Sequence, residues 1–139
     1  MADAAAILNQ HLYDNWTLEN PSRNDIYWAK SKVEAIDFAK MGKNYVVACY
    51  APMTAANVRL AAKNVWIIEE NVMVDIFVRV VSNVAEAVEK REAMRDEVYN
   101  ILKGSTPSGF VAADITREFK NESPDLVRVS LQVKLVKLA

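Results

Sequence analysis

A strict alternation of residues in two segments constrains the fold of this 139-residue chain more than any other feature. In the segment 72–80 (VMVDIFVRV) every even-numbered residue is β-branched, and the segment 126–135 (LVRVSLQVKL) alternates in a similar way. A period of two residues indicates strands with one buried face and one face that meets water or a partner. A sheet with two different faces is therefore the predicted centre of the fold.

The region between these two segments has the spacing of a helix. Asn83 and Glu86 stand in the relation of a capping box, and Gly104 supplies a stop. The apolar residues at helical spacing, interrupted only by Arg91, are Val84, Ala87, Val88, Met94, Val98, Ile101 and Leu102. The pattern predicts a helix of roughly twenty residues that packs on the sheet.

The N-terminal half predicts a second helix and further strands. Residues 4–16 have helical spacing, and Asp3 is placed to cap the first turn. Residues 26–28 are a short apolar group that predicts an edge strand. Residues 45–51 are apolar and rich in β-formers, and Pro52 ends the strand that they predict.

Three segments have weaker patterns. Residues 31–42 predict a short helix, because Ser31 and Glu34 form a capping box and Gly42 would end the helix, although an extended segment is also compatible. Residues 53–63 predict either an alanine-rich helix or a loop. Residues 69–71 are all polar, and we expect a tight turn there in preference to the polar middle of one long strand.

A hairpin is predicted at the C-terminal end, with a polar turn over residues 121–125. Its first strand is expected to place Val111, Ala113, Ile115, Arg117 and Phe119 on one face. Its second strand is expected to bury Val127, Val129, Leu131, Val133 and Leu135. The whole pattern predicts a single α+β domain over residues 1–139, with a mostly antiparallel sheet and an N-terminal helix and one long helix packed on one face.

The composition argues against several classes of protein. Seventeen basic and eighteen acidic residues are spread evenly, so strong sequence-independent binding to nucleic acid is not expected. Cys49 is the only cysteine, which excludes an internal disulfide and a thiolate zinc cluster and favours a reduced, cytosolic setting. We expect no signal peptide and no membrane span, because the chain lacks a basic leader and a long apolar run.

No catalytic signature is present. His11, the only histidine, reads as a helix residue, and Cys49 reads as a small core residue. Asp114 and Glu118 are predicted to share one strand face about 13 Å apart, too far to hold one ion. Three glycines cannot build a phosphate-binding loop. We therefore expect a protein that is not an enzyme, with no cofactor and no metal site.

Tyr27 and Trp28 are flanked by Arg23, Lys30 and Lys32. Three interpretations stay open: Trp28 packs into the core, the group forms a protein interface, or it stacks on single-stranded nucleic acid. Large apolar side chains on the outer face of the 72–80 strand, and an apolar tail at 135–138, suggest a surface that another chain covers. The candidate interface residues are Tyr27, Trp28, Met73, Phe77, Arg79, Arg128 and Lys134.

The order of these elements resembles the tail-terminator and tail-completion (neck) proteins of tailed viruses. The resemblance lies in the strand 74–79, the helix 87–103, the strand ending at 117–119, the turn with Pro124 and Asp125, and the long final strand. An N-terminal helix followed by an apolar strand also fits that pattern. The similarity covers most of the chain and is weakest over residues 21–42 and 52–63.

This resemblance implies a virion structural protein, a tail terminator or head-tail neck component, that is assembled in the host cytoplasm. Such proteins form a homo-oligomeric ring of about six copies that caps the tail tube. The implied partners are the tail tube protein and a neck or connector protein, with DNA only as cargo passing through the ring. An alternative is a small cytosolic α+β module that binds a peptide or single-stranded nucleic acid, and an oligomeric enzyme with sites between subunits is a third.

Overall fold

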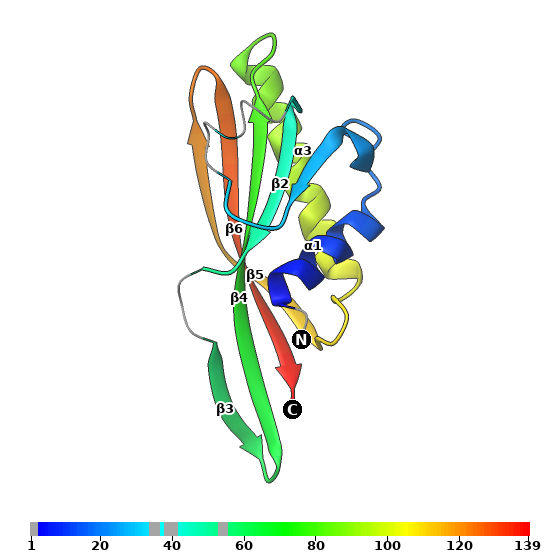
Figure 1. The fold of residues 1–139 in the computed structure, drawn as a ribbon, viewed down its shortest axis with the longest axis vertical. Helices are drawn as coiled ribbons and strands as arrows, with labels where there is room; N and C mark the ends of the chain where they lie inside the picture. Colours follow the sequence, from blue (N-terminus) through cyan, green and yellow to red (C-terminus); the bar gives the residue numbers. More distant parts are fainter. Residues whose placement is uncertain (1–2, 34–36, 38–41, 53–55) are drawn as a thin grey trace.

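The computed structural model describes residues 3–33, 37, 42–52 and 56–139 (Figure 1). These residues form a mostly antiparallel sheet with α-helices on one face, which confirms the predicted α+β class. The elements in chain order are α1 (Ala4–Asn15), the short 3-10 helix η1 (Arg23–Asp25), β1 (Ile26–Ala29), β2 (Tyr45–Tyr50), β3 (Asn57–Ala62), β4 (Val65–Arg79), α3 (Val84–Gly104), β5 (Ala112–Glu122) and β6 (Leu126–Leu138).

The strands are ordered β1-β2-β4-β6-β5. β3 pairs with residues 65–69 at the start of β4, beyond the end of β2. β1 runs parallel to β2, and the other strand pairings among the described residues are antiparallel. The edge strand predicted at residues 26–28 is confirmed, as are the strands predicted at 45–51 and at 126–135. The sheet therefore has a long central strand, β4, with partners on both sides.

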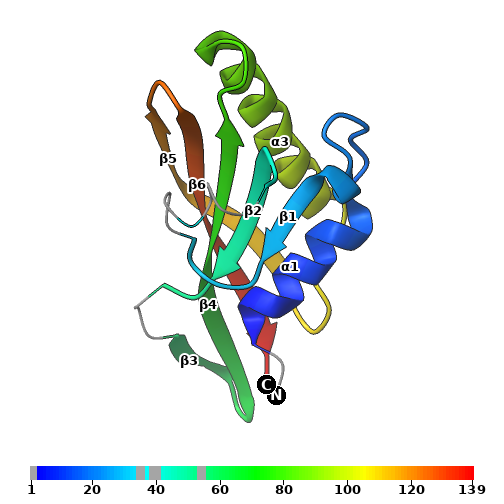
Figure 2. The same ribbon diagram turned by 45° about the horizontal axis from the view of Figure 1, so that its top comes forward.

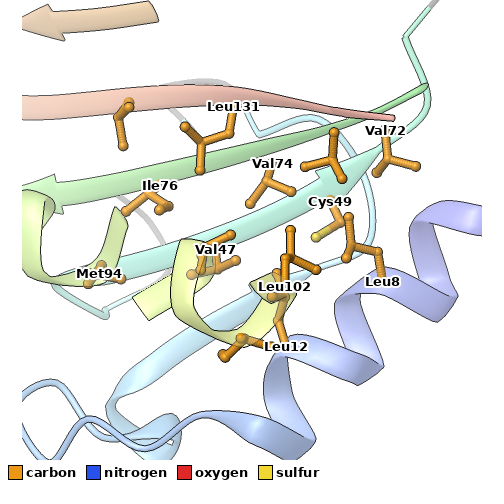
Figure 3. Packing of buried hydrophobic residues seen from close by; sticks show 14 of the residues in the cluster. Leu8, Leu12, Val47, Cys49, Val72, Val74, Ile76, Met94, Leu102 and Leu131 are labelled. Atoms are coloured by element: carbon orange, nitrogen blue, oxygen red, sulfur yellow. The ribbon is translucent and has the colours of Figure 1, made fainter. Parts of the chain in front are cut away.

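The core lies between the sheet and the two helices. α1 covers β2 and β4, while α3 covers β4 and β6 (Figure 2). Leu8 and Leu12 of α1 and Met94 of α3 point towards strand residues such as Val74 and Leu131 (Figure 3). The predicted inward row of β6 is fully buried, and each such aliphatic side chain contributes about 1.5–3 kcal/mol to folding.

Both helices begin at the predicted caps. Asp3 Oδ1 accepts a hydrogen bond from the Ala6 amide at 2.9 Å, and Asn83 Oδ1 accepts one from the Glu86 amide at 2.9 Å. These bonds satisfy amides that have no partner inside the helix. The positions predicted for both helix starts are thus confirmed.

Two charged residues of α3 are buried where the helix meets its neighbours. Arg91, the polar residue within the apolar stripe, donates to Glu92 at 2.8 Å and to Glu122 of β5 at 3.1 Å. Glu97 Oε2 accepts hydrogen bonds from the Thr17 amide, the Thr17 hydroxyl and the Leu18 amide at 2.7–2.8 Å. Glu97 therefore connects the segment after α1 to the middle of α3.

The predictions for residues 69–71 and for most of 53–63 are wrong. Residues 69–71 continue β4 because they pair in register with Val136, Leu135 and Lys134 of β6. Residues 57–62 form β3, which pairs with the start of β4 through a tight turn at Lys63 and Asn64. Asn64 takes a φ of 65°, a conformation that asparagine tolerates in such turns.

We call the segment 57–71 the arm. It projects beyond the helices, away from the body of the domain (Figure 1). The helix predicted within residues 31–42 lies outside the described residues, because residues 34–36 and 38–41 are not described. Residues 53–55 of the other weak segment are not described either.

The prediction that Arg117 and Phe119 share a face of β5 with Ile115 is wrong, because the strand contains a bulge. Ile115 pairs with Val133 and Arg117 pairs with Gln132, so Thr116 is an extra residue. One extra residue sends every following side chain to the opposite face. Phe119 and Arg117 therefore lie on the open face and not beside Ile115, and Glu118 points towards α3, where it binds Arg95.

Candidate functional site

The face of the sheet without α1 and α3, here called the open face, carries most of the predicted interface residues. Met73, Phe77 and Arg79 of β4 lie there with Arg128 and Lys134 of β6, as the pairing register requires. This face includes a polar cluster and an apolar cluster, both built from residues that alternate with the core row.

The polar cluster surrounds Asp75, whose side chain has no solvent exposure. Asp75 Oδ2 accepts hydrogen bonds from the Tyr50 hydroxyl at 2.9 Å and from Arg128 Nη2 at 2.8 Å. Arg128 Nε donates to Ser130 Oγ at 3.0 Å, and its guanidinium lies 5.1 Å from the centre of the Phe77 ring. Within the described residues, no group donates to Asp75 Oδ1. The cluster joins β2, β4 and β6 across the sheet.

Burial next to the Asp75 carboxylate raises the pKa of Tyr50 to about 12. The folded protein therefore holds this proton more tightly than the unfolded chain, in which a tyrosine titrates near pH 10. The resulting stability is fully present below about pH 10 and is lost as the pH rises to about 12.

We expect the free energy of unfolding to fall less steeply between these pH values in Tyr50→Phe than in the unaltered protein. Urea unfolding measured at steps of pH checks this. The absorbance of tyrosinate should show in parallel that the late-titrating phenol is missing from the variant. Equal slopes for the two proteins would contradict the assignment.

The apolar cluster of the open face consists of Ala29, Val33, Val46, Ala48 and Phe77, with Leu126 packed against it. Phe77 is 2% exposed. It therefore contributes to packing within its own chain and offers almost no surface to a partner. Met73 is half-buried beside this cluster, next to Tyr50 in the register of β2 and β4.

Tyr27 and Trp28 point to opposite faces. Tyr27 is exposed on the open face, whereas the Trp28 ring makes edge contacts with Tyr13 at 5.5 Å and Trp16 at 5.4 Å between ring centres. The Trp28 indole N–H donates to the Arg23 carbonyl at 2.8 Å. Trp28 thus packs beneath α1, in keeping with the core interpretation, and the two aromatics do not form one surface.

The arm carries an apolar surface that the sequence reading missed. Val58, Leu60 and Trp66 are 54%, 56% and 45% exposed, and they share the helix side of the sheet with Ile68. Elsewhere that side is covered by α1 and α3. Contiguous exposed apolar side chains of this size mark interaction sites. The alternation of Val58 and Leu60 was a strand signal, but the neighbouring alanines obscured it.

His11 lies beside a serine, at Nε2 3.0 Å from Ser105 Oγ. The Asn15 amide donates to the His11 carbonyl at 2.9 Å, and the same nitrogen lies 3.4 Å from His11 Nδ1. His11 Nδ1 faces the Asn15 amide and not a carboxylate, so the pair lacks the acidic group that orients the base in a catalytic triad.

The remaining candidates for chemistry have structural roles. Cys49 is fully buried in β2, and burial raises the pKa of its thiol, which keeps the reactive thiolate from forming.

No group of three or more metal-ligating side chains occurs among the described residues. Within the same residues, no helix is long and apolar enough to cross a membrane.

Comparison with known proteins adds no family: no protein-family model and no curated protein matches this chain.

Proposed function

We propose that this chain is a virion structural protein, a tail terminator or a neck component, that forms a ring capping the tail tube and joining it to the neck. The observation that carries the proposal is the arm. It exposes Val58, Leu60 and Trp66 on a side of the sheet that the rest of the chain covers with helices. A protein that assembles with other subunits has a use for such a surface.

The order of the elements supports the same function. An N-terminal helix, an apolar strand, an alternating strand, a long helix and a C-terminal hairpin follow one another as in the tail-terminator pattern. Among the described residues, three ion pairs connect α3 to β5: Arg91 with Glu122, Arg95 with Glu118, and Glu92 with Lys120. Such pairs suit a rigid structural subunit, which needs no catalytic group.

The alternative, a small binding module for a peptide or single-stranded nucleic acid, receives less support. Stacking on bases requires exposed aromatic faces beside basic side chains. The Trp28 ring is packed against Tyr13 and Trp16, so Tyr27 remains as the exposed aromatic of that pair. Trp66 of the arm is another exposed aromatic, but Arg59 lies on the opposite face of β3 and pairs with Glu69 at 3.5 Å.

The mass of the purified protein in solution tests the proposal. We expect light scattering over a wide concentration range to show a species of several copies, and electron microscopy to show rings. Ring subunits meet head to tail through two different patches, so assembly should grow with concentration and stop at a closed number. A strict monomer or dimer, even with the tail tube protein added, would contradict the proposal.

A further inference from the structure

The outer edge of β5 is open. β5 is the last strand in the order of the sheet, and among the described residues no strand pairs with its outer edge (Figure 1). The bulge at Thr116 and the turn that begins at Ser123 limit the regular part of this edge to residues 117–122. Phe119 lies near the middle of this segment. An open edge presents backbone N–H and C=O groups that can pair with another strand.

The backbone groups of alternate residues point outwards from this edge. The Ser123 amide donates to the Leu126 carbonyl at 2.9 Å, and this bond sets the alternation along the antiparallel pair of β5 and β6. Phe119 therefore directs its N–H and C=O towards β6, whereas Glu118 and Lys120 direct theirs away from the sheet. The outward backbone groups thus lie symmetrically on the two sides of Phe119.

The Phe119 side chain is exposed and has no part in the core. It is 55% exposed on the open face and belongs to neither apolar cluster of the described residues. Its neighbours Glu118 and Lys120 lie on the helix side. There Glu118 pairs with Arg95 of α3, and Lys120 pairs with Glu92 of the same helix at 2.9 Å. Because α3 balances these two charges, they do not repel a strand that approaches the edge.

The order of the side chains around Phe119 is complementary to itself. When two copies of this edge pair antiparallel about a two-fold axis through Phe119, Glu118 of each copy lies opposite Lys120 of the other. Phe119 then lies opposite the second copy's Phe119, and Arg117 lies opposite the second copy's Asn121. Opposite charges and paired aromatic rings are cross-strand neighbours that stabilise a sheet.

The adjacent registers lack this complementarity. The axis must pass through a residue, because an axis between two residues would place side chains of opposite faces side by side. With the axis at Glu118, the Glu118 side chains of the two copies would lie opposite each other. With the axis at Lys120, the two Lys120 side chains would do so. Like charges directly opposite destabilise a sheet, so the order of charges favours one register of a second copy.

We propose that two copies of this chain pair through the outer edges of β5, antiparallel about Phe119, and form one continuous sheet. α3 packs over β4 and β6, inside this edge (Figure 2). In such a pair the two β6 strands lie about 14 Å apart, further than the spacing of about 8–10 Å at which helices pack, so the two α3 helices do not clash. The inference does not depend on the proposed ring, because a two-fold contact closes after two copies.

Disulfide trapping tests the contact and its register. Arg117→Cys and Asn121→Cys are mixed under mild oxidation, and Cys49 stays unreactive because it is buried. In the proposed register the two new cysteines are directly opposite, with Cα atoms about 4.5 Å apart, a distance that a disulfide spans. Two copies of the same variant have their cysteines about 13 Å apart along the strands. We expect the mixture to couple at least about tenfold faster than either variant with itself.

The matched control mixes Arg117→Cys with Glu89→Cys, an exposed position of α3 outside the sheet. Its rate measures random collision. Equal coupling in this mixture and in the mixture of Arg117→Cys with Asn121→Cys would overturn the contact. Faster coupling of either strand variant with itself would overturn the register.

Charges introduced at Phe119 give a second readout of the same coupling. Phe119→Lys in both trapping variants should slow the coupling at least about tenfold, because two like charges then lie directly opposite each other. Phe119→Lys in one variant and Phe119→Glu in the other should restore it. The urea midpoint should stay unchanged, since position 119 is exposed. Coupling that is the same in all these mixtures would show that Phe119 does not lie at the axis.

The proposed function is tested separately by the mass of the unaltered protein. Specific coupling of positions 117 and 121 without any ring would keep the paired edge and remove the proposed ring. Rings without this coupling would keep the ring and remove the paired edge.

Discussion

Replacing Arg128 with methionine is expected to lower the free energy of unfolding by about 3–5 kcal/mol. The reason is the carboxylate of Asp75, which has no solvent exposure and, among the described residues, keeps only the Tyr50 hydroxyl as a donor once the guanidinium is gone. One oxygen of that carboxylate already has no donor within the described residues. Urea unfolding followed by circular dichroism measures the loss.

The double variant Asp75→Asn/Arg128→Met provides the control. It removes both charges together, so no buried charge remains without a partner, and we expect it to be more stable than Arg128→Met alone. Single Arg128→Lys should fall between the unaltered protein and Arg128→Met, because an ammonium keeps the charge but not the planar pair of donors that reaches Asp75 and Ser130. A double variant less stable than Arg128→Met would refute the argument.

Replacing Glu97 with alanine is expected to cost about 3 kcal/mol. Three donors from Thr17 and Leu18 converge on one oxygen of this buried side chain, and two of them are backbone amides that would lose their partner. Thermal and urea unfolding measure the loss. The matched control is Glu89→Ala, at an exposed position of the same helix, which should change stability by less than about 0.5 kcal/mol.

Glu97→Gln separates the charge from the shape. The amide oxygen can still accept from the Thr17 and Leu18 amides, but bonds to a neutral acceptor are weaker than bonds to a carboxylate. We therefore expect a loss of about half that of Glu97→Ala. An alanine variant no less stable than Glu89→Ala would show that the segment after α1 is held by the packing of Trp16 and not by these bonds.

The parts of the fold that were predictable from the sequence are those in which one repeating pattern determines the structure. The row from Val127 to Leu135 repeats every second residue and is buried, as expected. The helix start at Asn83 follows from a cap that acts over three residues. In both cases the residues that determine the structure are close together in the chain, so the sequence alone is enough to predict it.

Features that depend on distant partners were not predictable. Residues 69–71 are polar, yet they remain in a strand because β6 supplies their hydrogen bonds. Thr116 becomes a bulge only through the register of β5 against β6, and this one residue moves Phe119 to the other face. The pair of Asp75 and Arg128 joins residues 53 positions apart.

The candidate surfaces were likewise predictable where a local pattern determines them and not predictable where distant segments meet. The open face was predictable as a face, because the alternation of β4 assigns Met73, Phe77 and Arg79 to it. That Phe77 is buried by a second small cluster was not predictable, since Val33 and Ala48 come from other parts of the chain. The arm was missed because β3 has helix-forming alanines and gains its strand structure from pairing with β4.

The unbroken course of β4 has a mechanical consequence. The strand runs from the turn at Asn64 to Arg79 as one ladder, and residues 67–79 pair with β6 without a shift in register. At about 3.3 Å per residue the strand is roughly 46 Å long, and its pairing with β6 is not interrupted where the arm leaves the body. We therefore expect the arm to keep a fixed direction relative to the domain, because one strand continues from the arm into the core.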